Sequence, residues 1–127
     1  MAAVIPMSVA EICDRWSIAK LRLERLHEED PAELRRQVDH YAAGIDFDDP
    51  ALAKLAYQLL ESNAEQWDME AAIRRGEMDD ADLAEVGRLA LRVRTQNRCR
   101  CRIKNEITKL VGSGFHEVRV NYAEGGV

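Results

Sequence analysis

Two long stretches of helix-forming sequence, joined by a very short connection, constrain this fold more than any other feature. The first is predicted over 50–75, and the second runs from a capping aspartate, Asp79 or Asp80, to Val111. Only the segment GEMDD (76–80) separates them. Because so short a connection leaves no room for a crossover, the two helices are predicted to be antiparallel neighbours.

Two shorter helices are predicted before this pair. Ser8 is the expected N-cap of the first, and Glu11 stands three residues later, where it can close a capping box. The second is expected over 31–43, with Pro31 at its first position, and it either follows the first helix or continues it with a kink. The predicted fold is therefore an all-α helical bundle with two long antiparallel helices and a kinked N-terminal helical arm.

The C-terminal segment 115–127 has a different pattern. Val118, Val120 and Tyr122 alternate with polar residues, which predicts a short strand or an extended tail. A lone strand is not stable by itself, so the tail is expected to lie on the bundle or on a partner chain. The 127 residues are expected to form a single helical domain, 1–127, that includes this tail.

The overall charge and composition argue against several classes of function. The net charge of −5 disfavours a general binder of nucleic acid or anionic membranes. No apolar run approaches the roughly 20 residues of a membrane span. The first residues lack the basic region and long apolar core of a signal peptide, which makes the protein an expected cytoplasmic one.

The cysteines and histidines indicate neither a disulfide nor a metal site. The three cysteines are odd in number, and Cys99 and Cys101 point in different directions on a helix. None of the three histidines stands at helical spacing from a cysteine or from another histidine. No metal and no cofactor is therefore expected.

The most informative pattern of the last long helix lies on the face that a heptad repeat would place against neighbouring helices. We call this face the seam. Both ends of that seam are apolar, but Asn97, Arg100 and Lys104 occupy its middle. The preceding helix changes in the same way, because its apolar face leads into a polar stretch of Asn63, Trp67, Glu70 and Arg74. Polar groups on a face that should be buried are costly unless they are paired.

Two explanations of this polar face remain open. In the first it is a structural network in which Glu70 pairs with a nearby base. In the second it is a pocket between helices whose excess positive charge holds an anionic ligand. The candidate ligand-binding residues are Asp14, Arg22, Arg25, Asn63, Trp67, Glu70, Arg74, Asn97, Arg100 and Lys104. A simple hairpin would place Glu70 and Arg100 some 20 Å apart at 1.5 Å per residue, unless the first helix bridges the two clusters.

The remaining bases of the last helix are predicted to be solvated. Arg94, Arg98 and Arg102 lie on the side opposite the seam. No aromatic residue is interleaved with them for base stacking, which disfavours a nucleic-acid surface.

Four segments together resemble a small bacterial family of all-helical proteins of unknown function, whose genes often lie near glycosyltransferase and surface-polysaccharide genes. The segments are SVAEICDRWSIAKLRLERL (8–26), NAEQWDMEAAIRRGE (63–77), TQNRCRCRIKNEI (95–107) and GSGFHEVRVNY (112–122). The positions that match the family pattern are Asp14, Arg15, Arg22, Arg25, Asn63, Trp67, Asp68, Glu70, Arg74, Asn97, Arg100, Lys104, Glu117 and Tyr122. The chain departs from the pattern at Lys20, Ala71, Ala72 and Arg98, which makes it more basic there. The resemblance implies a link to surface-glycan synthesis and no known reaction.

The function expected from these observations is that of a cytoplasmic accessory or binding protein, with the link to surface-glycan biosynthesis that the resemblance implies. Its ligand would be a phosphorylated sugar, a nucleotide-sugar or an acidic segment of a partner protein, and a homodimer is plausible. One alternative is a small helical enzyme in which Glu70 is the general acid or base and the arginines stabilise negative charge. Another is a purely structural helical scaffold.

Overall fold

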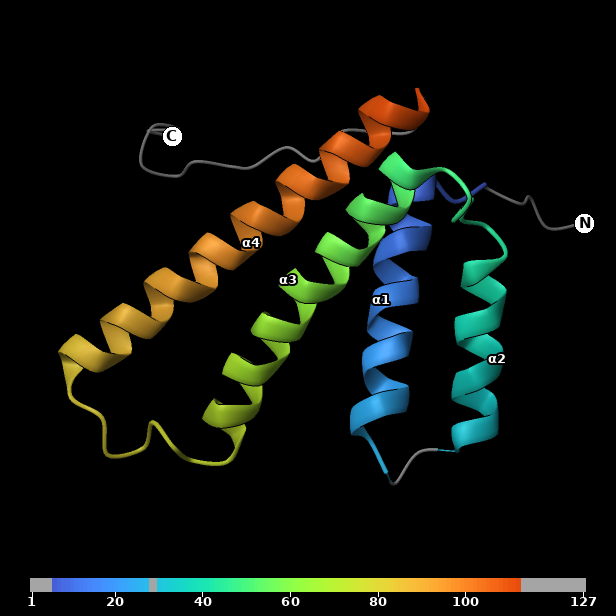
Figure 1. Ribbon diagram of the computed structural model, residues 1–127. Helices are drawn as coiled ribbons and strands as arrows, with labels where there is room; N and C mark the ends of the chain where they lie inside the picture. The colour runs from blue at the N-terminus through green and yellow to red at the C-terminus, as the bar shows by residue number, and fades with distance from the viewer. Residues whose placement is uncertain (1–5, 28–29, 113–127) are drawn as a thin grey trace, which may run out of the picture.

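The computed structural model describes residues 6–27 and 30–112, which form four α-helices (Figure 1). The helices are α1 (Val9–Arg25), α2 (Pro31–Ala42), α3 (Pro50–Arg74) and α4 (Leu83–Val111). No β-strand occurs within the described ranges. The prediction of an all-α bundle is confirmed, while the predicted tail, 115–127, lies outside the described residues.

Side-chain caps determine where the helices begin. The Ser8 hydroxyl accepts a hydrogen bond from the Glu11 amide at 3.3 Å, and Asp30 and Asp49 cap α2 and α3 in the same way. Such a cap satisfies amides that have no partner within the first turn of a helix. The helix starts predicted at Ser8 and Pro50 are therefore confirmed.

The start of α4 differs from the prediction. Its N-cap is Asp82, whose carboxylate accepts from the Glu85 amide at 2.8 Å, and not Asp79 or Asp80. Two successive turns occupy the residues before it, with the Asp79 amide bonded to the Gly76 carbonyl and the Ala81 amide to the Met78 carbonyl. Gly76, with a φ of +79°, ends α3 before these turns, because the Gly76 amide bonds to the Ile73 carbonyl and the Glu77 amide to the Ala72 carbonyl. The connection is thus longer than predicted.

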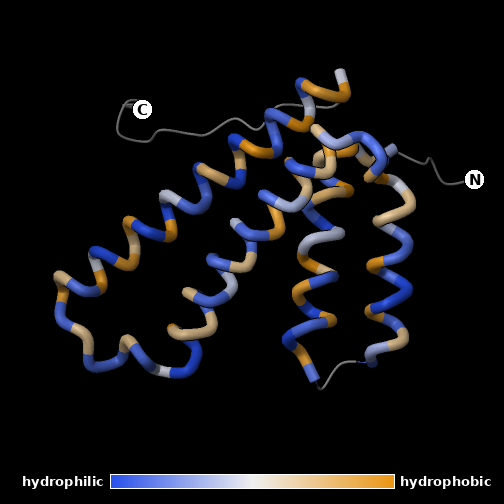
Figure 2. The backbone as a smooth tube through the Cα atoms, in the orientation of Figure 1, coloured by the Kyte–Doolittle hydropathy of each residue, from blue (hydrophilic) through white to orange (hydrophobic). Residues whose placement is uncertain are grey.

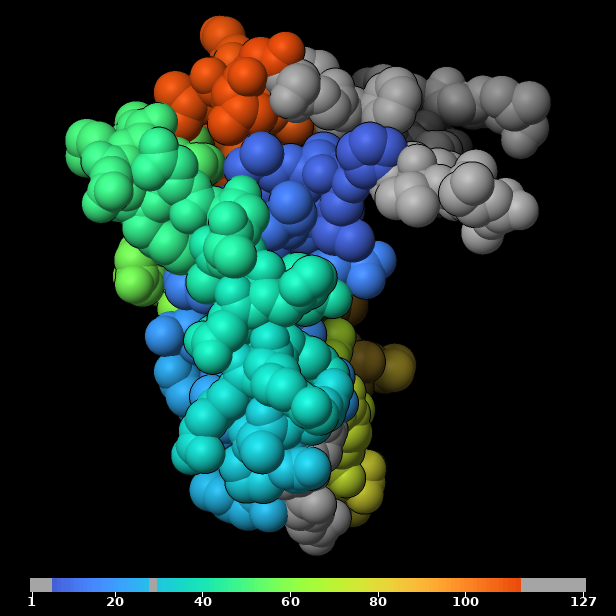
Figure 3. Space-filling view, turned by 90° about the vertical axis from the view of Figure 1, so that its right-hand side faces the viewer, coloured from blue at the N-terminus to red at the C-terminus, as the bar shows by residue number. Residues whose placement is uncertain are grey.

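Helix α1 lies at the centre of the bundle. It contacts α2, α3 and α4, whereas α2 contacts only α1 among the described helices. The chain reverses direction after α1, so that α2 packs back along it as a separate antiparallel helix and does not extend it with a kink (Figure 1). In a view turned by 90° from that of Figure 1, α2 lies in front of α1 and covers its outer face (Figure 3). The connection between α3 and α4 makes them antiparallel neighbours, as predicted.

The apolar core lies where α1 and α3 begin and α4 ends. Trp16 is 3% exposed and stands in ring contact with Phe47 at 5.2 Å and Tyr57 at 5.5 Å between ring centroids. The buried core residues are Ala10, Cys13, Trp16, Ile45, Leu52, Ala56, Leu59, Ile103 and Ile107. Three helices and the loop before α3 therefore share one core, and α2 closes its outer side.

The opposite end of the α3–α4 pair is much less covered. We call residues 69–94 the hairpin arm. On its α4 side only Leu89 is buried, whereas Leu83 is 90% exposed and Leu91 60% exposed. Hydrophobic residues nevertheless recur along both of its helices (Figure 2). The apolar seam of α4 was expected to be buried along its whole length. This expectation is wrong for the half of α4 in the hairpin arm, because only α3 packs against α4 there.

None of the four helices combines the length and the apolar character that a membrane-spanning helix requires.

Leu59, which is fully buried among three helices, is predicted to be essential for stability. We expect Leu59→Ala to lower the free energy of unfolding by about 2–5 kcal/mol, because it removes apolar contacts and leaves a cavity. Urea denaturation measures the change. The same substitution at Leu110, which is 44% exposed, should lower it by less than about 1 kcal/mol. Equal losses at the two positions would contradict the placement of the core.

Candidate functional site

The polar seam is organised around one buried carboxylate, that of Asp14 in α1. Asp14 is 6% exposed. Arg100 of α4 donates two hydrogen bonds to it, from Nε to Oδ1 at 3.1 Å and from Nη2 to Oδ2 at 2.6 Å. Asn63 of α3 donates a third, from Nδ2 to Oδ1 at 3.0 Å. A single carboxylate thus joins three helices through a bidentate ion pair and an amide.

Ser17 completes this network one turn further along α1. It is fully buried, and its hydroxyl donates to the Asp14 carbonyl oxygen at 2.7 Å. The same hydroxyl accepts from Asn63 Nδ2 at 2.7 Å. The amide group of Asn63, itself 5% exposed, therefore uses Nδ2 for both contacts. Buried polar groups are tolerated when their hydrogen bonds are made within the protein, as they are here.

A second ion pair lies one turn along the seam. Lys104 of α4 is 4% exposed, and its Nζ lies 2.5 Å from Glu11 Oε1 of α1. Glu11 is therefore engaged with α4 and does not close the predicted capping box by bonding back to Ser8. Both bases in the middle of the α4 seam are matched by carboxylates of α1.

The network changes the acid–base properties of its members. Burial acts to raise the pKa of Asp14, but the hydrogen bonds from Arg100 and Asn63 and the nearby positive charges outweigh it, so that this pKa is lowered. The hydrogen bond to Asp14 raises the pKa of Arg100. Burial, together with the adjacent Asp14 charge, raises the pKa of the Cys13 thiol to about 11. Asp14 is thus held as an anion, and Cys13 is a neutral thiol unsuited to nucleophilic chemistry.

A small open pocket of about 180 Å³ lies beside the network, between α1, α3 and α4. Its lining residues are Asp14, Ile18, Asn63, Gln66, Trp67, Glu70 and Arg100. Glu70 and Arg100, which a simple hairpin would separate, both line this pocket, because α1 bridges the two clusters and Arg100 extends toward Asp14. Five of the residues that the sequence marked as candidates are therefore brought together.

The other candidate residues lie elsewhere. Arg74 pairs with Glu70 on the same helix at 3.3 Å, with its own side chain 74% exposed. Arg25 bonds to Asp68 at 2.5 Å, and Arg22 is half-buried, but neither lines the pocket. Asn97 was expected in the seam and is exposed, because α4 turns Gln96 toward α3 in its place.

The sequence did not indicate the roles of Ser17, Glu11 and Gln66. Ser17 and Glu11 stand three residues to either side of Asp14, and Gln66 donates to Glu70 at 3.3 Å. A helical face on which Glu11, Asp14 and Ser17 recur every three residues is the pattern that would have indicated the α1 side of the network. Arg94, Arg98 and Arg102 are exposed, as predicted.

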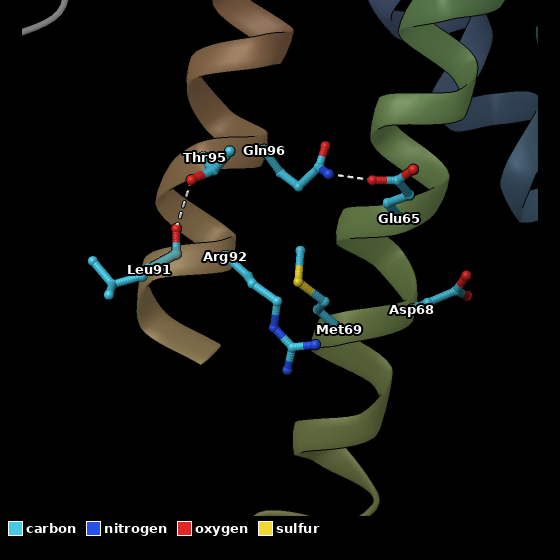
Figure 4. Close-up of a pocket in the computed structure, with 7 residues that line it drawn as sticks. All are labelled: Glu65, Asp68, Met69, Leu91, Arg92, Thr95 and Gln96. Atoms are coloured by element: carbon cyan, nitrogen blue, oxygen red, sulfur yellow. Dashed lines mark hydrogen bonds between the residues drawn. The ribbon is translucent and has the colours of Figure 1, made fainter. Parts of the chain in front are cut away.

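A larger open pocket of about 450 Å³ lies between α3 and α4 near the hairpin arm (Figure 4). Its apolar side chains are Met69 and Leu91. The Gln96 amide donates to Glu65 across it, and the Thr95 hydroxyl donates to the Leu91 carbonyl within α4 at 3.0 Å. None of the ten candidate residues lines this pocket.

Within the described ranges, no group of three or more histidine, cysteine or acidic side chains is placed to hold a metal ion. No protein-family model, no curated protein and no solved structure matches the chain.

The bidentate pair of Asp14 and Arg100 is predicted to be strongly coupled. Asp14→Ala should lower the free energy of unfolding by about 3 kcal/mol, because it leaves a guanidinium and an amide without their acceptor. In a double-mutant cycle with Arg100→Ala, the coupling energy should be about 1–3 kcal/mol.

The exposed pair of Glu33 and Arg36 on α2 provides the control for this cycle. Its coupling energy should be below about 1 kcal/mol. Additive effects of the Asp14 and Arg100 substitutions would show that the pair is not formed.

The lowered pKa of Asp14 predicts a specific loss of stability in acid. The folded state keeps this carboxylate ionised at a pH where the unfolded chain, with a pKa of about 3.9, already binds a proton. The contribution is therefore present above about pH 4 and is lost as the pH falls through the lower, folded value. Urea titrations should show a shallower acid decline for Asp14→Asn than for the wild type. Asp39→Asn, on the exposed side of α2, should keep the wild-type decline. Identical slopes in all three proteins would refute the assignment.

Proposed function

We propose that the protein is a non-catalytic binding protein whose pocket between α1, α3 and α4 takes a small uncharged, hydroxylated group, such as one sugar residue of a larger ligand. The observation that carries the proposal is the charge balance of the pocket. Two carboxylates, those of Asp14 and Glu70, line it together with one guanidinium, that of Arg100. Because both hydrogen bonds described for Arg100 go to Asp14, the pocket has no excess of positive charge.

This balance disfavours the anionic ligands expected from the sequence. Three bases were expected from the sequence to bind an anionic ligand, and each of them is already paired with a carboxylate of the chain. The pairs are Arg74 with Glu70, Arg100 with Asp14, and Lys104 with Glu11. A phosphorylated sugar, a nucleotide-sugar or an acidic protein segment would have to displace one of these carboxylates, and separating a buried pair is costly. These anions are therefore the competing ligands in the test below.

The remaining lining supports a hydroxylated ligand. Trp67 and Ile18 supply apolar surface, and Glu70 and Gln66 supply acceptors and donors. The volume of about 180 Å³ is smaller than the roughly 300–1,000 Å³ of pockets that enclose a whole small molecule. The pocket therefore suits one ring of a longer glycan, in keeping with the link to surface-glycan synthesis that the family resemblance implies.

The enzyme alternative has less support. A carboxylic acid that serves as a general acid near neutral pH usually lies in a dry, apolar site that raises its pKa. The Glu70 side chain is 46% exposed, and its hydrogen-bond donors are Gln66 and Arg74 of the same helix. This arrangement suits the recognition of a hydroxyl group better than proton transfer. In the scaffold alternative, the pocket has no ligand.

A thermal-shift screen of neutral oligosaccharides against inorganic phosphate tests the proposal. A neutral glycan at 100 times its dissociation constant should stabilise the wild type by about 2.7 kcal/mol, and phosphate should not. The response, measured from each variant's own Tm, should disappear in Trp67→Ala and weaken in Glu70→Gln.

The control is Glu61→Gln, which makes the same change on an exposed part of α3 and should respond like the wild type. Stabilisation by phosphate alone, or a glycan response that persists in Trp67→Ala, would contradict the proposed site. The absence of any response would favour the scaffold alternative.

A further inference from the structure

We propose that the hairpin arm is a self-association surface through which two copies of the chain pair, with their α4 helices antiparallel, about a two-fold axis close to Gly87. The exposed face of α4 that forms this surface shares no residue with the pocket of the proposed function, so that either proposal can fail without the other.

The first observation is an exposed face on α4 that no described element covers. Leu83, Gly87 and Ala90 stand at positions i, i+4 and i+7 and are all exposed. Val86 flanks them at 45% exposed and Leu91 at 60%. A Leu that is 90% exposed, with exposed apolar neighbours on the same face, is typical of an interaction surface.

The centre of this face is open. A Cβ atom added at Gly87 would meet no atom within 4 Å, so nothing in the described part of the chain requires a glycine there. Glycine inside a helix lowers its stability by about 1 kcal/mol relative to alanine. The close approach of a second helix at this position is a physical reason for a glycine.

The second observation is the distribution of charge, which identifies the partner. Residues 77–85 contain five acidic residues and no base, whereas 86–102 contain six arginines and no acid. The helix dipole accounts for acids in the first turn of α4, but it does not extend to arginines several turns later. The connection and first turn of α4 are therefore acidic, and the turns of α4 that follow are basic.

Antiparallel pairing brings these opposite charges together. Residues equally distant from Gly87 in sequence face each other across the axis, so that Leu83 of one copy lies near Leu91 of the other. Asp80 lies in the turn just before α4, beyond Leu83, and so comes close to Arg94, which is the next position of the exposed face after Ala90. Because the axis is two-fold, each contact is made twice. Parallel pairing would place acid against acid and arginine against arginine.

Both charged partners are available for this contact. Asp80 and Arg94 are exposed, and neither forms an ion pair with another residue in the described part of the chain. A second copy supplies an apolar face and the opposite charges at the same time, which a purely acidic or purely basic partner does not.

Sedimentation equilibrium on the full chain, from about 1 μM to 1 mM, tests the proposal. The wild type should show a concentration-dependent dimer. Arg94→Asp should raise the dissociation constant by about tenfold or more, and the double variant Asp80→Arg/Arg94→Asp should restore it, because the double exchange recreates both ion pairs. Arg35→Asp, the same change on the exposed side of α2, should leave the constant unchanged.

Gly87→Glu provides a second, independent variant. It should abolish the dimer, because the two glutamates would meet at the axis, yet it should leave the monomer as stable as the wild type or slightly more so. A wild type that stays monomeric throughout would overturn the proposal. So would a dimer that Arg94→Asp and Gly87→Glu leave intact, since association would then use another surface.

Discussion

The carboxylate of Asp14 is the group on which the arrangement of the helices depends. Burying a charge is strongly unfavourable unless another charge and further hydrogen bonds satisfy it. Here Arg100 supplies the charge from α4, and Asn63 supplies a hydrogen bond from α3. Because Asp14 and its two partners come from three helices, satisfying Asp14 fixes how those helices are placed relative to one another. The apolar core adjoins this group and supplies the larger, less directional part of the stability.

The same arrangement explains why the two ends of the α3–α4 pair differ. Where α1 is present, it buries one face of both long helices and pairs with Arg100 and Lys104. Beyond the reach of α1, α4 has only α3 as a neighbour, and its apolar residues, such as Leu83, remain exposed. One end of the pair is therefore completed within the chain, and the other is the surface that we propose a second copy covers.

Much of the fold was predictable because helix signals are local. Ser8 and Pro50 mark helix starts through caps and fixed dihedral angles that depend on few neighbours. The α4 cap at Asp82 was missed because Asp79, Asp80 and Asp82 offer equivalent caps, and the two turns that follow α3 decide between them. In the candidate site, the sequence showed that Arg100 stands at a seam position where an apolar residue is expected, but it did not show which residue pairs with it. The contact with Asp14 spans 86 residues and depends on where α1 packs, which the local pattern does not contain.

The negative group that the α4 seam holds belongs to the protein itself, since Arg100 is bonded to Asp14. The most direct measurement is an NMR titration of the Asp14 carboxyl carbon, carried out with and without inorganic phosphate. We expect the pKa of Asp14 to lie below the ordinary value of about 3.9 and to be unchanged by phosphate, because Arg100 remains on the carboxylate. A pKa at or above that value, or one that rises when phosphate is added, would show that Arg100 is free to hold an external anion.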